Sequence, residues 1–144
     1  MGEVVNAVSE ATDNEAILVT DVGQNQMLAC RYFKFAKKRS VVTSGGMGTM
    51  GFCLPAAIGA TFGAPERTVC AFMGDGGLQM TMQELGTVME QKAPVKIILM
   101  NNNYLGNSTS VASHVLQSPL FVYSDDEPRL HADCSGIMVF LHAG

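Results

Sequence analysis

Short apolar runs alternate along this chain with longer segments of helical character. The run Ala16-Ile17-Leu18-Val19-Thr20 ends at Asp21, and three later runs of the same kind also end at small or polar residues. Apolar runs this short, bounded by turn residues, are typical of buried strands. We therefore predict strands at residues 16–20, 41–43, 68–73 and 95–100.

The segments between these runs predict helices. Pro55 lies near the start of one such segment, where the first turn of a helix tolerates proline. Thr81 and Glu84 have the spacing of a capping box, which predicts a helix that starts near Met82 and continues to about Gln91. The predicted helices are residues 2–12, 24–33, 54–62 and 82–91.

The alternation of strands and helices predicts an α/β fold, with a parallel sheet flanked by helices on both faces. Residues 1–107 carry this alternation, whereas residues 108–144 show no clear period. We therefore treat 1–107 as a partial domain and 108–144 as a tail, and expect the sheet to be incomplete at its C-terminal edge. In such sheets, ligands bind in the loops at the carboxyl ends of the strands.

Composition and charge exclude several classes of protein. The chain has 144 residues, of which 47% are hydrophobic, and a formal net charge of −4 without a basic block. We expect no disorder of the whole chain, no nucleic-acid partner, and no membrane partner, since no apolar run is long enough to cross a bilayer. The four cysteines form no CxxC pair and stand beside 10 methionines, which predicts reduced core cysteines and a cytoplasmic protein.

Two polar motifs follow neighbouring strands of the predicted sheet. Gly74-Asp75-Gly76-Gly77 follows one strand, and Asn101-Asn102-Asn103 follows the next, so both loops should emerge at the same edge. A carboxylate and a carboxamide are hard oxygen ligands for Mg²⁺, which commonly completes its coordination with phosphate and water. Glycines let backbone N–H groups approach an anion, and a helix N-terminus near Met82 would add favourable partial charge. Each motif alone is more often a turn, but together they predict a Mg²⁺-diphosphate site.

Further segments accompany these two motifs: Asp21-Val22-Gly23-Gln24, Thr43-Ser44-Gly45-Gly46-Met47-Gly48-Thr49-Met50-Gly51-Phe52, Leu54-Pro55-Ala56-Ala57-Ile58-Gly59-Ala60, Gln79-Met80-Thr81-Met82-Gln83-Glu84-Leu85, Pro94-Val95-Lys96-Ile97-Ile98 and Tyr104-Leu105-Gly106. With them, residues 1–107 resemble the diphosphate-binding domain of thiamine diphosphate enzymes, and most closely the catalytic subunit of acetolactate synthases. The glycine-rich segment 45–51 is more specific than the metal motif, which in that family is Gly-Asp-Gly followed by Asn-Asn.

The resemblance implies a thiamine diphosphate cofactor with Mg²⁺. Asp75, the Asn102 side chain and the Tyr104 backbone carbonyl would hold the metal. The Gly48 carbonyl would accept a hydrogen bond from the aminopyrimidine, and Met50 would hold the cofactor bent, although composition alone favours an ordinary core methionine. The residues that would line the diphosphate are Val22, Gly23, Gln24, Asn25, Gly74, Gly76 and Gly77. Asn25 replaces a histidine that is common in the family.

The resemblance further implies decarboxylation of pyruvate and its carboligation to a second 2-oxo acid, for the synthesis of the branched-chain amino acids isoleucine and valine. The glutamate that activates the aminopyrimidine belongs to a separate N-terminal, pyrimidine-binding domain, normally that of the partner in a homodimer. Glu3 and Glu10 match no such motif, so we expect no catalytic glutamate in this chain and no turnover by the chain alone. Another thiamine diphosphate-dependent decarboxylase or carboligase, and a non-catalytic cofactor-binding module, are the alternatives.

The resemblance stops abruptly at Asn107, and we predict a one-base insertion or an equivalent frameshift near its codon. Family members continue with a Val-Arg-Gln-Trp-like stretch, whereas this chain reads Ser108-Thr109-Ser110-Val111 and has no Trp. Codons for these residues can spell Val-Arg-Gln-Trp when the first base of the Ser108 codon is discarded. Sequencing the DNA tests the prediction: codons that cannot spell this continuation would leave simple divergence as the explanation.

Overall fold

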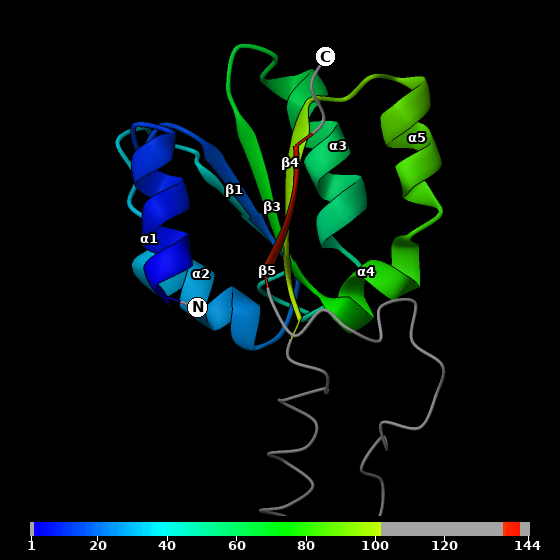
Figure 1. Cartoon of the computed structure of the whole chain (residues 1–144), viewed down its shortest axis with the longest axis horizontal. Coiled ribbons are helices and arrows are strands. Elements are labelled where there is room, and N and C mark those ends of the chain that lie inside the picture. The colour runs from blue at the N-terminus through cyan, green and yellow to red at the C-terminus, as the bar shows by residue number, and fades with distance from the viewer. Residues whose placement is uncertain (1, 102–136, 142–144) are drawn as a thin grey trace, which may run out of the picture.

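The computed structural model describes residues 2–101 and 137–141, which form a sheet between two layers of helices (Figure 1). The helices are α1 (Gly2–Ala11), α2 (Gln24–Tyr32), α3 (Cys53–Gly63), α4 (Asp75–Thr81) and α5 (Glu84–Glu90). The strands are β1 (Ile17–Thr20), β2 (Val41–Thr43), β3 (Val69–Gly74), β4 (Val95–Met100) and β5 (Ile137–Leu141). None of the described helices has the length and apolar character that crossing a membrane requires.

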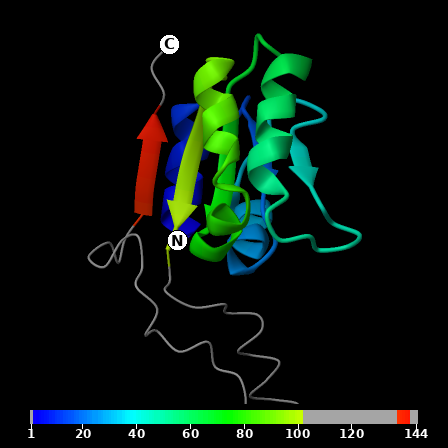
Figure 2. The same ribbon diagram turned by 90° about the vertical axis from the view of Figure 1, so that its right-hand side faces the viewer.

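The strands form one sheet in the order β2-β1-β3-β4-β5. The first four strands along the chain run parallel, and β5 runs antiparallel beside β4 (Figure 2). The register pairs Thr20 with both Thr43 and Phe72, and Gly74 with Met100. The carboxyl ends of the parallel strands therefore lie together, at the lower edge of the sheet in Figure 1.

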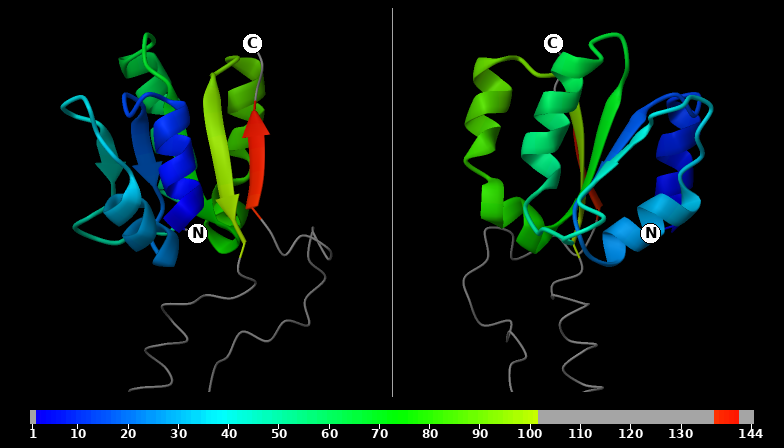
Figure 3. Two further views of the ribbon diagram at one scale, coloured as in Figure 1. Left: turned by 60° about the vertical axis from the view of Figure 1, so that its left-hand side comes forward. Right: turned by 180° about the vertical axis from the view of Figure 1, so that it is seen from behind.

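Successive residues of each strand face opposite helix layers, because side chains alternate along a strand. In β3, Ala71 and Met73 belong to one core cluster, while Cys70 and Phe72 belong to the other. Helices α3 and α5 cover the first face, and α1 and α2 cover the second (Figure 3). Burial on both faces explains why β1, β3 and β4 consist almost entirely of apolar residues.

The predicted parallel α/β fold is confirmed, and the elements predicted before residue 75 agree with the structure to within one residue at each end. The helix predicted from near Met82 to about Gln91 is α5, Glu84–Glu90, but the sequence did not predict the separate helix α4 before it. Asp75 starts α4 directly after β3, where a loop was expected, and α5 begins only at Glu84. The capping box does not form, because Thr81 ends α4 and the Glu84 carboxylate instead accepts a hydrogen bond from Thr87, 3.0 Å away.

Strand β5 lies in the tail, for which the sequence predicted no element. Its five residues are all apolar, and each pairs with a residue of β4. The pairing starts with Ile137 beside Met100 and ends with Leu141 beside Lys96. The strand therefore adds an antiparallel edge to the parallel sheet. The division of the chain at residue 107 and the frameshift both stay predictions.

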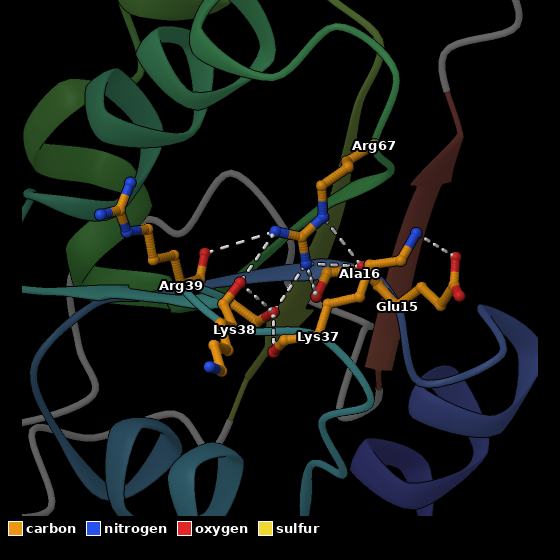
Figure 4. A network of polar contacts seen from close by, with 7 residues as sticks. Glu15, Ala16, Lys37, Lys38, Arg39 and Arg67 are labelled. Atoms are coloured by element: carbon orange, nitrogen blue, oxygen red, sulfur yellow. Dashed lines mark hydrogen bonds and ion pairs between the residues drawn. The ribbon is translucent and has the colours of Figure 1, made fainter.

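The opposite end of the sheet is held by Arg67, which precedes β3 (Figure 4). Its guanidinium donates to the backbone carbonyl of Glu15 at 2.7 and 3.1 Å and to the Ser40 hydroxyl at 2.6 Å. Longer hydrogen bonds reach the carbonyls of Lys38 and Arg39. The planar fork of donors in arginine makes this arrangement possible, and it joins the segments that lead into β1 and β2.

Two of the cysteines lie in the core, and one does not. Cys53 and Cys70 are buried free thiols, as predicted, and burial raises the pKa of Cys70 to about 11, although the nearby Lys96 lowers it. The prediction was wrong for Cys30, which is exposed because it follows the buried Ala29 on α2 and faces outward. Cys134 lies outside the described residues.

We expect Phe72→Ala to lower the free energy of unfolding by about 3–5 kcal/mol, because it leaves a cavity in the core. Phe72 is fully buried, and its ring meets that of Phe33 edge-on at 6.1 Å. Phe62→Ala is the matched control: Phe62 is 59% exposed, and its loss should cost no more than about 0.5 kcal/mol. Urea unfolding measures both, and equal losses would contradict the assignment of the core.

Candidate functional site

The candidate site lies at the edge where the parallel strands end. Thr20 and Thr43 end β1 and β2, and the Thr20 hydroxyl donates to the Thr43 hydroxyl at 2.9 Å. Gln26 of α2 also donates to the Thr43 hydroxyl, at 2.8 Å. Gly74 and Met100, which pair with each other, end β3 and β4. The segments with predicted site residues therefore all begin at this edge. They are residues 21–25, 44–51 and 74–77, and the segment that starts at Asn101.

Helices α2 and α4 both begin at this edge, and each has a glycine as its N-cap. Gly23 has a φ of 132°, which L side chains rarely adopt, and Gly74 is extended. Neither N-cap supplies a side-chain hydrogen bond, so N–H groups in both first turns need other acceptors. Helix N-termini of this kind attract anions. Sequence analysis expected only one such N-terminus, and it placed that N-terminus at Met82.

Asp75 is half-buried as the first residue of α4. Its Oδ1 accepts a hydrogen bond from the Gly76 N–H at 3.0 Å, which holds the carboxylate at the start of the helix. Acidic residues are favourable in the first turn of a helix, and this accounts for α4 starting here rather than after a loop.

The two strands that precede the polar motifs end at the same edge, as the sequence predicted. Since Gly74 pairs with Met100, Asp75 and Asn101 directly follow neighbouring residues of the sheet. The other two predicted metal ligands, Asn102 and Tyr104, lie outside the described residues. Within the described part of the chain, no three His, Cys, Asp or Glu side chains gather in a group that could hold a metal.

The loop Ser44–Gly51 turns back on itself and contacts the connection between β1 and α2. The Gly48 N–H donates to the Ser44 carbonyl at 2.8 Å. A Cβ atom on Gly48 would lie 3.4 Å from Val22 Cγ2, so two of the predicted cofactor-binding segments are in contact. Gly48 is exposed and Met50 is half-buried, so Met50 is not one of the buried core methionines.

Asn25 is 7% exposed and joins two of the segments at this edge. Its side-chain amide donates to the backbone carbonyl of Asp21 at 3.2 Å and to that of Phe72 at 3.3 Å. A Cβ on Gly74 would lie 3.9 Å from Asn25 Oδ1. The amide nitrogen is thus directed at protein carbonyls, and a hydrogen bond from it to a diphosphate stays a prediction.

Asp21, for which the sequence predicted no functional role, is 1% exposed directly after β1. Its Oδ2 accepts a hydrogen bond from the Gly51 N–H at 3.1 Å, and its Oδ1 has no partner among the described residues. A Cβ on Gly77 would collide with Oδ2, so only glycine fits there. The available signal was an aspartate at the end of an apolar run, which also marks an ordinary strand end.

Cys53, at the start of α3, lies beside Asp21. Burial and the Asp21 carboxylate raise the pKa of the Cys53 thiol well above its usual value, so the group stays protonated. The thiol donates to the Val19 carbonyl at 3.3 Å. Cys53 therefore fixes the start of α3 to β1, and it is unsuited to act as a thiolate nucleophile.

Comparison with known proteins identifies the family. Residues 21–131 match the family described as "Thiamine pyrophosphate enzyme, C-terminal TPP binding domain", in which thiamine pyrophosphate is another name for thiamine diphosphate. The chain is 52% identical over 103 residues to the acetolactate synthase isozyme 1 large subunit of Escherichia coli (strain K12). This alignment covers 72% of this chain and 18% of that subunit. The acetolactate synthase large subunit of Lactococcus lactis subsp. lactis is 48% identical over 104 residues, again 72% of this chain and 18% of the relative. The chloroplastic acetolactate synthase 2 of Nicotiana tabacum is 49% identical over 102 residues, 71% of this chain and 15% of the relative.

The chain thus spans 15–18% of the length of these relatives. The family match takes in every segment that meets at the carboxyl edge of the sheet, from Asp21 to Asn101, and extends past residue 107. The resemblance predicted from the sequence is confirmed, and so is the predicted cofactor as that of the family. The chain belongs to the family of thiamine pyrophosphate enzymes, as a C-terminal TPP-binding domain.

Proposed function

We propose that this chain is the cofactor-binding part of an acetolactate synthase catalytic subunit and binds thiamine diphosphate with Mg²⁺ at the carboxyl edge of its sheet. The observation that carries the proposal is the meeting, at that edge, of two glycine-capped helix N-termini and the Asp75 carboxylate. The similarity to acetolactate synthase large subunits from two bacteria and a plant supports the choice of enzyme.

The residues at this edge fit a diphosphate. Neither helix has a side-chain hydrogen bond from its N-cap, and apart from the N–H groups of Gln26 and Gly76, which have protein acceptors, the first-turn N–H groups would donate to phosphate oxygens. Glycines at the N-caps and after Asp75 keep side chains away from the ligand. The residues assigned to the diphosphate are Val22, Gly23, Gln24, Asn25, Gly74, Gly76 and Gly77.

Asp75, the Asn102 side chain and the Tyr104 carbonyl would hold Mg²⁺. These are three hard oxygen ligands, and phosphate oxygens and water complete the coordination that Mg²⁺ prefers. Asp75 follows the strand that pairs with β4, and Asn102 follows β4 by two residues, which supports a shared ion.

When bound, thiamine diphosphate supplies a carbanion and an electron sink for 2-oxo acid chemistry. The role of this chain would be to bind the cofactor and to orient it. The Gly48 carbonyl would accept a hydrogen bond from the aminopyrimidine amine, and Met50 would pack against the cofactor to keep it bent. Both residues belong to the Ser44–Gly51 loop, and the contact between Gly48 and Val22 supports a site shared with the diphosphate-binding segments.

The substrates of the proposed enzyme are pyruvate and a second 2-oxo acid, and its product serves the synthesis of isoleucine and valine. The glutamate that activates the aminopyrimidine would come from the N-terminal domain of the partner subunit in a homodimer. The free thiols of Cys30, Cys53 and Cys70 support a reducing, cytoplasmic location.

We expect the chain to bind thiamine diphosphate only when Mg²⁺ is present, and Asp75→Ala to raise the dissociation constant by about tenfold or more, because it removes a charged metal ligand. Titration calorimetry with and without Mg²⁺ measures this. Glu66→Ala is the matched control, since it removes an exposed carboxylate from a turn outside the site, and it should bind as the wild type does. Binding that needs no Mg²⁺, or that survives Asp75→Ala unchanged, would contradict the proposed site.

We expect no turnover by the chain alone, and formation of 2-acetolactate from pyruvate when the separately purified N-terminal domain of an acetolactate synthase is added. Product analysis by mass spectrometry detects it. The control is the same N-terminal domain with its activating glutamate replaced by glutamine, which should yield nothing. A different ligation product would favour another carboligase, and binding without any turnover would favour a non-catalytic module.

A further inference from the structure

The geometry points to Asp21 as a positioning residue whose buried carboxylate fixes the Ser44–Gly51 loop and the first turn of α4 relative to each other. We call Asp21, Gly51 and Gly77 the Asp21 junction. The inference rests on the proposed function, in which the loop holds the aminopyrimidine and the first turn of α4 holds the diphosphate and the metal. The junction would then keep the two ends of the cofactor site in register.

The first part of the junction is the bond to the loop. Asp21 is held to the sheet because its own N–H donates to the Phe72 carbonyl at 3.0 Å. Its Oδ2 accepts from the Gly51 N–H at 3.1 Å, and this bond is buried. Burial keeps water from competing for this hydrogen bond, which strengthens it. The end of the loop is therefore fixed to the end of β1.

The second part of the junction is the contact with α4. The Asp21 carboxylate occupies the space that a Cβ on Gly77 would fill, in the first turn of the helix. Gly51 has a φ of 85°, and a Cβ there would lie 3.1 Å from Thr81 Cγ2 and 3.2 Å from Met80 Cβ. Helix α4 is thus contacted by Asp21 at its start and by Gly51 at its end, and it can shift only if the loop shifts with it.

The hydrogen bonding of the junction also points to a role beyond stability. Two buried side-chain atoms in the described residues lack a partner, Asp21 Oδ1 and Thr81 Oγ1, and both residues adjoin Gly51. Buried polar atoms without partners are uncommon, and where they occur they call for an explanation. Positioning needs only the acceptor at Oδ2, which asparagine would retain and alanine would remove.

Binding of two probes to the 144-residue chain tests the inference. Mg²⁺-pyrophosphate occupies only the diphosphate end, whereas Mg²⁺-thiamine diphosphate spans both ends. Asp21→Ala should raise the dissociation constant for thiamine diphosphate by about tenfold or more, as expected for a lost buried hydrogen bond, and change that for pyrophosphate by less than about threefold. Asp21→Asn should rescue binding of thiamine diphosphate, and Asp13→Asn, at an exposed turn, controls for the lost charge. An equal loss for both probes would overturn the inference.

Amide exchange in the ligand-free chain tests the junction without any cofactor. Asp21→Ala should speed the exchange of the Gly51 N–H, measured by NMR, by about tenfold or more, because its buried acceptor is gone. The exposed Gly46 serves as the internal reference, and its exchange should not change. An unchanged Gly51 rate would overturn the inference. A wild-type chain that binds neither probe would instead refute the proposed function, and the exchange result would stand by itself.

Gly77→Ala gives a second route if Asp21→Ala fails to fold. The added methyl group must displace the Asp21 carboxylate, so the Gly51 amide should again exchange faster. Combining Asp21→Ala with Gly77→Ala removes the collision, and the double variant should be more stable to urea than Gly77→Ala alone. A Gly77→Ala chain with the wild-type Gly51 exchange rate would show that the carboxylate does not fix the loop.

Discussion

The parallel pairing of β1, β3 and β4 is the constraint on which the rest of the structure depends. Its register is fixed by packing more than by polarity, because both faces of the sheet are apolar. The small Ala71 faces α3, where Ala57 is also fully buried, while the large Phe72 faces α1 and α2. A slip of one residue would turn every side chain to the opposite face and drive the phenylalanine ring into the close contact with α3. Because the register is fixed, the strand ends stay side by side at the carboxyl edge. The segments that follow the strands therefore start close to one another.

The two ends of this sheet solve the problem of unpaired backbone groups in opposite ways. At one end the guanidinium of Arg67 takes up the carbonyls of the segments that enter β1 and β2, so the protein satisfies its own polar groups. At the other end, α2 and α4 start from Gly23 and Gly74, which offer no side-chain cap to the first-turn N–H groups. A ligand that accepts those hydrogen bonds binds only the folded chain, and its binding therefore adds to the stability of the fold.

Sequence reasoning succeeded where structure is local or periodic. Apolar runs revealed the strands because both faces are buried, and the parallel topology then placed Asp75 and Asn101 at one edge. It failed at residues 75–83, because Gly-Asp-Gly-Gly has the composition of a turn and the spacing of Thr81 and Glu84 imitates a capping box. The burial of Asp21 could not be foreseen, since it depends on Gly51, which lies 30 residues away along the chain, and on the missing side chain of Gly77.

The charges at the carboxyl edge give the metal of the proposed site a physical role. Asp21 and Asp75 are acidic residues in a region proposed to hold a diphosphate, and they are part of a chain whose formal net charge is −4. The partial positive charge of two helix N-termini, about half an elementary charge each, does not offset two carboxylates and the charges of a diphosphate. In the proposed site a divalent cation would offset part of this excess, because phosphate oxygens and the Asp75 carboxylate would be its ligands. Asp21 does not share that ion in the proposed site, since its Oδ2 accepts a hydrogen bond from the Gly51 N–H and packs against Gly77 of α4. The proposed site would therefore favour the complex of metal and cofactor over bare diphosphate.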